Sequence, residues 1–223
     1  MNSRPENIDT PQGLSLAICA YVFWGFLPLY MKLLAHVPPS EVVAHRVIWS
    51  VPIAALLLVL LGRLGDLKTA LKTPKMLMMG CVTAAFVSIN WGIYVWAVGS
   101  GYALEAALGY YINPLFSIAL GAILLGERLT RAQMVAVGLA ALAVVILTVE
   151  AGRLPMAALG LTGSWGGYAF FKKSLPIGPN QGFLLEVLIL TPPALGYIAY
   201  LTVTGQGHFA VTSADTLLLL GTG

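Results

Sequence analysis

The chain has 223 residues, of which 58% are hydrophobic and only 9% are charged, and its formal net charge is +3. An average soluble domain contains roughly 25% charged residues. A soluble fold could not cover this much apolar surface, so the composition excludes a soluble protein, and the small positive charge indicates no nucleic-acid partner.

Predominantly apolar runs recur along the chain, each close to the roughly 20 residues that a bilayer-spanning helix needs. They predict an all-α polytopic membrane helix bundle with short connections and no extramembrane domain. The longest connections are the basic stretch from Arg63 to Lys75 and the polar one from Thr204 to Asp215. The predicted spans are residues 14–35, 41–62, 75–99, 103–125, 131–150, 155–173 and 181–203, and an eighth begins at Thr216.

The first span contains a motif that returns in the sixth. Trp24-Gly25, followed by Lys32, is repeated as Trp165-Gly166, followed by Lys173, at an offset of 141. The repeating unit therefore holds five spans, and an odd number of crossings inverts the second copy relative to the first, as in many secondary transporters. We expect a first five-helix repeat over residues 1–150 and a truncated second repeat over residues 151–223.

Basic residues predict how the spans are oriented, because cytoplasmic segments carry an excess of Lys and Arg. With a cytoplasmic N-terminus, nine of the twelve basic residues fall on the inner side. The acidic residues before the first span argue against a cleaved signal peptide. The nine are Arg4, Arg63, Lys68, Lys72, Lys75, Arg128, Arg131, Lys172 and Lys173.

Polar residues inside the spans predict the functional site. A charged side chain at a helix centre costs about 2.5–3.5 kcal/mol on insertion scales, so it normally faces a cavity or a partner. Several lie four residues apart, which places them on one helix face. These stripes, which predict the wall of a polar cavity, are Glu41, His45 and Trp49, with Arg46 alongside; Asn90 and Tyr94; and Glu105, Gly109 and Asn113.

The repeat places Glu186 at the position that Arg46 holds in the first copy, at an offset of 140. We therefore expect a cation near one mouth of the cavity and an anion near the other. Simpler readings stay open. Glu41 and Glu105 lie near span ends, where an interfacial role fits equally well, and Glu41, His45 and Arg46 could form a structural ion-pair cluster. Gly163 and Gly167 have the GxxxG spacing that permits close helix packing.

Clustered motifs in the first repeat closely resemble the RarD branch of the EamA family, in the drug/metabolite transporter superfamily. The resemblance implies ten helices in two inverted five-helix repeats, in the inner membrane of a bacterium, whereas this sequence ends within the eighth span. The matching residues are Trp24-Gly25, Pro28, Tyr30 and Lys32; Glu41, His45-Arg46 and Trp49-Ser50; Asn90-Trp91, Tyr94 and Trp96-Ala97-Val98; Glu105-Ala106, Leu108-Gly109-Tyr110 and Ile112-Asn113-Pro114-Leu115; and Glu127-Arg128-Leu129.

We predict a secondary active transporter, an exporter of small molecules that works by alternating access, because the chain has no Walker-type phosphate loop. The expected partners are the lipid bilayer, a small-molecule substrate and a second copy in a homodimer; no cofactor and no metal are expected. The predicted substrate pathway contains Trp24, Lys32, His45, Arg46, Trp49, Asn90, Tyr94, Tyr110 and Asn113, and the candidate proton carriers are Glu41, His45, Glu105 and Glu186.

Two other classes of protein were weighed against a transporter. A membrane enzyme is not expected, because the chain has no HExxH, no GxSxG and no paired aspartates. A non-transporting membrane subunit is the main alternative. It fits a chain that holds one repeat and part of another.

Overall fold

The computed structural model describes residues 11–126, 128–173 and 175–223, and these residues form nine α-helices. Six of the helices, α1, α2, α4, α5, α6 and α8, are long and apolar enough to cross a membrane, which confirms the predicted polytopic helix bundle. The bounds are α1 (Pro11–Leu33), α2 (Pro39–Leu60), α3 (Leu64–Lys72), α4 (Pro74–Gly99), α5 (Ala103–Leu125), α6 (Arg131–Ala151), α7 (Met156–Lys172), α8 (Pro179–Thr204) and α9 (Ser213–Leu220).

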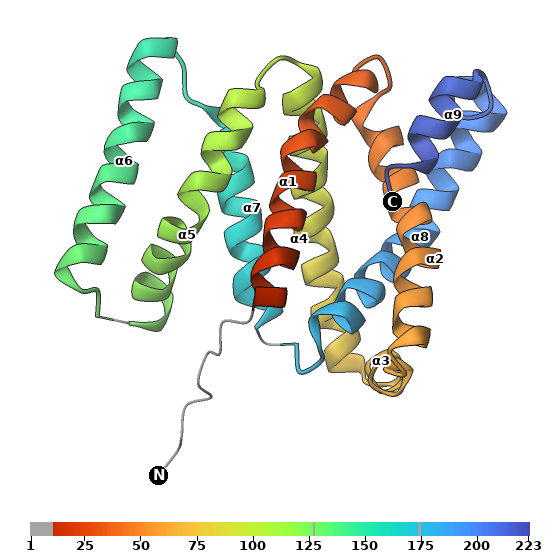
Figure 1. Ribbon diagram of the computed structural model, residues 1–223, viewed down its shortest axis with the longest axis horizontal. Helices are drawn as coiled ribbons and strands as arrows, with labels where there is room; N and C mark the ends of the chain where they lie inside the picture. Colours follow the sequence, from red (N-terminus) through yellow and green to blue (C-terminus); the bar gives the residue numbers. More distant parts are fainter. Residues whose placement is uncertain (1–10, 127, 174) are drawn as a thin grey trace.

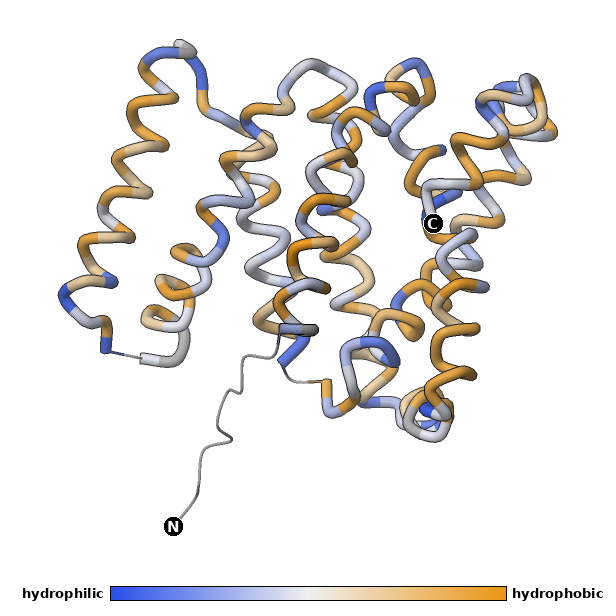
Figure 2. The backbone as a smooth tube through the Cα atoms, in the orientation of Figure 1, coloured by the Kyte–Doolittle hydropathy of each residue, from blue (hydrophilic) through white to orange (hydrophobic). Residues whose placement is uncertain are grey.

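The long helices stand side by side and alternate in direction, so the connections gather at two ends of the bundle (Figure 1). The α3 end contains α3 with its two connections, the start of α1, and the α5–α6 and α7–α8 connections. The α9 end contains the α1–α2, α4–α5, α6–α7 and α8–α9 connections. Hydrophobic residues follow the helices, and hydrophilic ones gather mainly at both ends (Figure 2). Eight of the nine basic residues predicted for inner segments belong to the α3 end, and the ninth, Arg4, lies outside the described residues.

Helices that carry the repeated motif run in opposite directions. The chain passes from the α3 end to the α9 end along α1 and returns along α7, and α2 and α8 are likewise opposed (Figure 1). Trp24 and Trp165 therefore lie on antiparallel helices, as an inverted repeat requires. The boundary between the repeats, after residue 150, stays a prediction.

The helices pack unevenly. Helix α2 lies against α8, and α7 contacts both α4 and α5. One buried apolar cluster includes Leu58 and Leu185, and a second includes Met31 and Leu161. In contrast, no residue of the apolar segment Arg131–Glu150 of α6 is buried. An apolar helix that contacts one neighbour and leaves every residue of this segment at least partly exposed fits hydrocarbon rather than water.

The basic stretch from Arg63 to Lys75 contains a helix that the sequence analysis did not anticipate. Helix α3 has nine residues, and it buries Leu67 and Ala70 against the bundle. It is too short and too charged to cross the bilayer, so the hydropathy pattern shows only a polar connection there.

Close helix packing occurs at some of the glycines. A Cβ atom at Gly167 would lie 2.5 Å from the Phe86 ring, so the packing role predicted for Gly167 is confirmed. The same prediction is wrong for Gly163, where a Cβ atom would meet nothing within 4 Å. At Gly109 the neighbour is backbone rather than a side chain, because a Cβ atom there would lie 2.9 Å from the Ala158 carbonyl oxygen. Gly109 therefore brings α5 and α7 together.

Candidate functional site

A fully buried asparagine joins three helices in the centre of the bundle. Asn90 on α4 donates from Nδ2 to the carbonyl oxygen of Leu161 (3.2 Å) and to Oγ of Ser164 (3.0 Å), both on α7. Its Oδ1 accepts a hydrogen bond of 3.1 Å from the Tyr110 hydroxyl on α5. All three contacts cross between helices, so Asn90 fixes how α4, α5 and α7 meet.

Aromatic rings extend this junction on both sides. The ring centroid of Tyr110 lies 5.9 Å from that of Tyr94 and 6.4 Å from that of Trp165. Asn113 follows Tyr110 by three residues and so shares its helix face. The Asn113 side chain is buried, and its Oδ1 has no hydrogen-bond partner within the described part of the chain. The junction thus combines flat apolar surfaces with amide and hydroxyl groups.

Arg46 of α2 lies beside the same junction. Its guanidinium carbon is 4.5 Å from the ring centroid of Trp91, and the hydroxyl groups of Tyr94 and Tyr110 interact with it electrostatically. No carboxylate of a described residue pairs with it. A desolvated cation–π contact is worth about 2 kcal/mol, less than the roughly 2.5–3.5 kcal/mol that a charge costs at a helix centre. The aromatic rings therefore offset only part of the cost of this cation.

We expect Asn90→Ala to lower the free energy of unfolding by about 2 kcal/mol, because it removes the two hydrogen bonds donated by a buried amide and leaves the Tyr110 hydroxyl without its acceptor. Chemical unfolding in mixed micelles measures the change. Ser88→Ala is the matched control on α4, since its hydroxyl bonds only to the Ala85 carbonyl of its own helix. It should change the free energy by less than about 0.5 kcal/mol. Equal effects of the two substitutions would contradict a structural role for Asn90.

A second polar cluster lies at the α9 end. The buried carboxylate of Glu41 accepts from the backbone N–H of His208 at 2.7 Å and lies 2.8 Å from its Nδ1. Close by, His36 Nε2 lies 2.9 Å from the Asp215 carboxylate. The hydrogen bond from Thr212 is the largest influence that lowers the pKa of Asp215, and the contact with His36 lowers it further. These contacts hold the α8–α9 connection against the start of α2.

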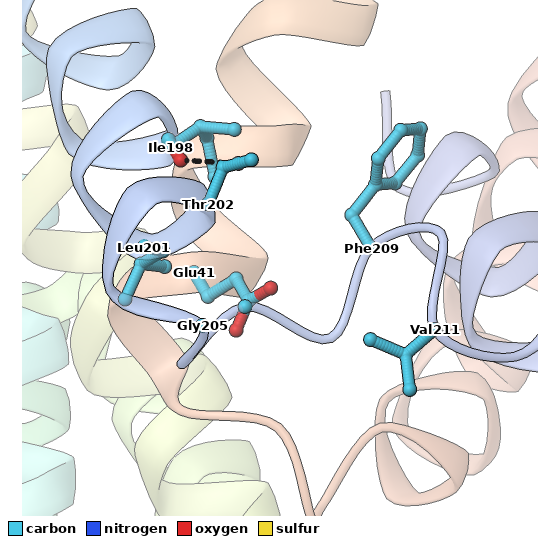
Figure 3. Close-up of a pocket in the computed structure, with 8 residues that line it drawn as sticks. Glu41, Ile198, Leu201, Thr202, Gly205, Phe209 and Val211 are labelled. Carbon is cyan, nitrogen blue, oxygen red and sulfur yellow. Dashed lines mark hydrogen bonds between the residues drawn. The ribbon is translucent and has the colours of Figure 1, made fainter.

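Glu41 also lines a small cavity of about 160 Å³ between α8 and the α8–α9 connection (Figure 3). Phe209 lines it from the connection, and its ring stacks on His45 with the centroids 4.8 Å apart. Trp49 Nε1 donates to His45 Nδ1 at 3.2 Å, whereas His45 Nε2 is buried with no hydrogen-bond partner in the described part of the chain. All three histidines of the chain therefore gather at this end.

The other candidate proton carriers each contact a basic side chain. Glu186 is fully buried on α8; it accepts from Lys172 Nζ on α7 at 2.5 Å and from the Tyr168 hydroxyl at 3.2 Å. Glu105, at the start of α5, forms an ion pair with the half-exposed Arg153. The pairing with Arg153 fits the interfacial reading of Glu105.

The structure thus divides the predicted site residues into groups. Arg46, Asn90, Tyr94 and Tyr110 meet in the centre, with Asn113 on the same face of α5. Glu41, His45 and Trp49 gather at the α9 end, and Glu105 and Glu186 each lie in a separate ion pair. Trp24 and Lys32 are exposed, and the ring contact of Trp24 is with Tyr21 of its own helix. Their place in a substrate pathway stays a prediction, and Glu127 lies outside the described residues.

Several residues of these clusters are not among the site residues predicted from the sequence: Trp91, Arg153, Ser164, Tyr168, Lys172 and His208. One signal was available, since Tyr168 and Lys172 are four residues apart on one helix face, like Glu41 and His45. Among the described residues, no group of three or more His, Cys, Asp or Glu side chains is arranged to hold a metal ion.

Comparison with known proteins assigns the family. Residues 11–149 match the family described as "EamA-like transporter family". The chain belongs to the EamA family. It is 42% identical to "Protein RarD" of Streptomyces exfoliatus, over 97% of this chain and 69% of that protein. It is 38% identical to an "Uncharacterized transporter" of Vibrio cholerae, over 99% of this chain and 73% of the relative.

A third relative is the "Chloramphenicol-sensitive protein RarD" of Pseudomonas aeruginosa, at 33% identity over 94% of this chain and 70% of that protein. Together the relatives place this EamA protein in the RarD branch. No solved structure matches the chain. The chain is therefore a multi-pass membrane protein of a transporter family.

Proposed function

We propose that this EamA protein is a secondary active transporter that exports small molecules across the bacterial inner membrane by alternating access, with its N-terminus in the cytoplasm. The observation that carries the proposal is that α7 runs opposite to α1, and α8 runs opposite to α2. Inverted helices of this kind can rock around a central site and open it first to one side and then to the other.

The polar centre supports the position of such a site. Asn90, Tyr110 and Arg46 lie on three different helices of the bundle, and α7 supplies Ser164. Movement of any of these helices changes the shape of the centre. The basic residues at the α3 end support a cytoplasmic N-terminus, because positive charge favours the inner side.

The contacts of the candidate proton carriers favour Glu41, together with its partner His208. Glu105 and Glu186 are each held in an ion pair, with Arg153 and Lys172 respectively. Glu41 instead faces His208, and imidazole is a common proton shuttle in proteins. Glu41 and His208 also join α2 to the α8–α9 connection. We therefore assign proton coupling to this pair.

Transport is tested with the purified chain in proteoliposomes. A screen of radiolabelled metabolites identifies a substrate, and an imposed pH gradient should raise its initial rate of transport at least about tenfold over the rate with the gradient collapsed. Glu41→Gln should make the rate insensitive to the gradient. Glu150→Gln is the control, because it makes the same change in charge at an exposed glutamate at the end of α6.

Two results would count against the proposal. A rate that ignores the gradient in the unmodified protein refutes proton coupling and leaves transport in place. A folded protein that moves no compound in the screen favours the alternative, a non-transporting membrane subunit.

A further inference from the structure

The inference concerns the class of substrate, and it rests on the proposed transport function. It begins with the position of Arg46. Arg46 is the eighth residue of α2, so it lies about 11 Å along the helix from its start at the α9 end. Its side chain is partly exposed, and its guanidinium group lies over Trp91 of the neighbouring helix α4. The cation is thus inside the bundle and still accessible.

Three glutamates on the helices of the bundle already contact a basic side chain. Glu41 contacts His208, Glu105 contacts Arg153, and Glu186 contacts Lys172. Each of these acids has its own base, whereas Arg46 has only aromatic partners among the described residues. The centre is therefore cationic, although the sequence alone suggests a wall of mixed charge.

A guanidinium is a strong donor to carboxylate and phosphate groups, because its N–H groups match the geometry of two oxygens. The neighbouring rings of Tyr94 and Tyr110 add flat apolar surface beside it. Asn113 adds a buried amide whose oxygen has no partner in the part of the chain that the structure describes. These groups suit a small molecule with one anionic group on a flat, apolar body.

We propose that Arg46, with Trp91, Tyr94 and Tyr110, forms a binding site for a small organic anion, and that the anionic group of the ligand supplies the counter-charge that Arg46 lacks. Neutral and cationic molecules of the same shape bind weakly at this site. Binding of the anion removes the charge imbalance in the centre of the bundle.

Equilibrium binding tests the site with three probes of one shape and different charge: benzoate, benzamide and benzylamine. The full chain is placed in nanodiscs of neutral phosphatidylcholine, so that no anionic lipid can occupy the site, and tryptophan fluorescence is titrated. We expect benzoate to bind at least about tenfold more tightly than benzamide, with benzylamine the weakest. Equal affinity for benzoate and benzamide overturns the proposal. This comparison uses only the unmodified protein, so it does not depend on whether a variant folds.

Substitutions then locate the site. Arg46→Gln should weaken benzoate binding at least about tenfold, and Arg46→Lys, which keeps the charge but loses the planar fork, should weaken it less. Lys75→Gln is the matched control, because it removes one positive charge from an exposed position at the α3 end. Size-exclusion chromatography verifies that each variant is folded. Benzoate affinity that is the same in both folded Arg46 variants and in the unmodified protein overturns the proposal.

Binding and transport are measured separately, so the two proposals fail in different ways. Binding of benzoate that depends on Arg46, without transport of any compound, supports the anion site and refutes the transport function. Transport of neutral compounds that is unaffected by Arg46→Gln supports the transport function and refutes the anion site. If benzoate binds more weakly in nanodiscs that contain anionic lipid, a lipid headgroup competes for the same site. That result still supports anion binding by Arg46.

Discussion

Replacing Glu186 with leucine should lower the free energy of unfolding by about 3 kcal/mol, the lower part of the range for breaking a buried ion pair by removal of one partner. The carboxylate is fully buried and accepts from both Lys172 and Tyr168. Its loss leaves the Lys172 ammonium without a counter-charge. Lys172 is 19% exposed and ends its helix, so it can turn partly toward water, which limits the loss.

The double substitution Glu186→Leu with Lys172→Leu distinguishes the cost of an unpaired charge from the value of the pair. Removing both charges should restore most of the lost stability, because two apolar groups of similar size replace a buried ion pair at little cost. Chemical unfolding in mixed micelles gives all four free energies of the cycle. A double variant that is no more stable than Glu186→Leu alone would contradict this account.

The Glu105–Arg153 pair serves as the comparison for the buried pair. The Arg153 side chain is 46% exposed, and water screens it. Glu105→Leu should therefore cost less than about 1 kcal/mol. If Glu105→Leu lowers the free energy of unfolding as much as Glu186→Leu does, exposure to water does not determine how much each ion pair contributes.

Gly109→Leu should lower the free energy of unfolding by about 3 kcal/mol or prevent folding, since it forces side-chain atoms into a tightly packed contact. Even a single Cβ atom at Gly109 would lie 2.9 Å from the carbonyl oxygen and 3.1 Å from the Cα atom of Ala158. Backbone atoms cannot turn away as a side chain can, so α5 and α7 must separate. Separation also lengthens the 3.0 Å hydrogen bond from Thr162 Oγ1 to the Gly109 carbonyl oxygen.

Gly163 offers a matched control within the same pair of helices. A Cβ atom there meets nothing within 4 Å, so Gly163→Ala should leave stability unchanged or raise it by up to about 1 kcal/mol, the helix propensity gained over glycine. Gly109→Ala should lie between this control and Gly109→Leu. Equal stability of the Gly109→Ala and Gly163→Ala variants would show that the α5–α7 contact can relax.

Hydropathy was sufficient to predict the long helices, because a bilayer span needs a continuous apolar run and the chain interrupts each run with polar residues. The ends of α4, α5 and α6 agree with the predicted spans to within a residue. Helix α3 could not be recognised in this way. It has nine residues and a small buried face, and its charged residues are typical of a loop.

The residues of the central site were predicted better than their partners. Helical spacing places Asn90 and Tyr94 on one face, and both lie in the centre. It cannot show that Glu186 meets Lys172 or that Glu41 meets His208, because those pairs are 14 and 167 residues apart and depend on how helices pack. Sequence also cannot distinguish a lipid-facing Trp24 from one in a cavity, since a tryptophan in an apolar run looks the same in both places.

The length of α7 has a consequence for the surrounding lipid. Its 17 residues extend about 26 Å, less than the roughly 30 Å thickness of the hydrocarbon core of a bilayer. The short helix contacts both α4 and α5, whereas α6, whose 21 residues extend about 31 Å, contacts α5 and has no buried residue in its apolar segment. Neighbouring helices therefore shield α7 from its mismatch with the bilayer, and a change in membrane thickness acts on the tilt of α6 first.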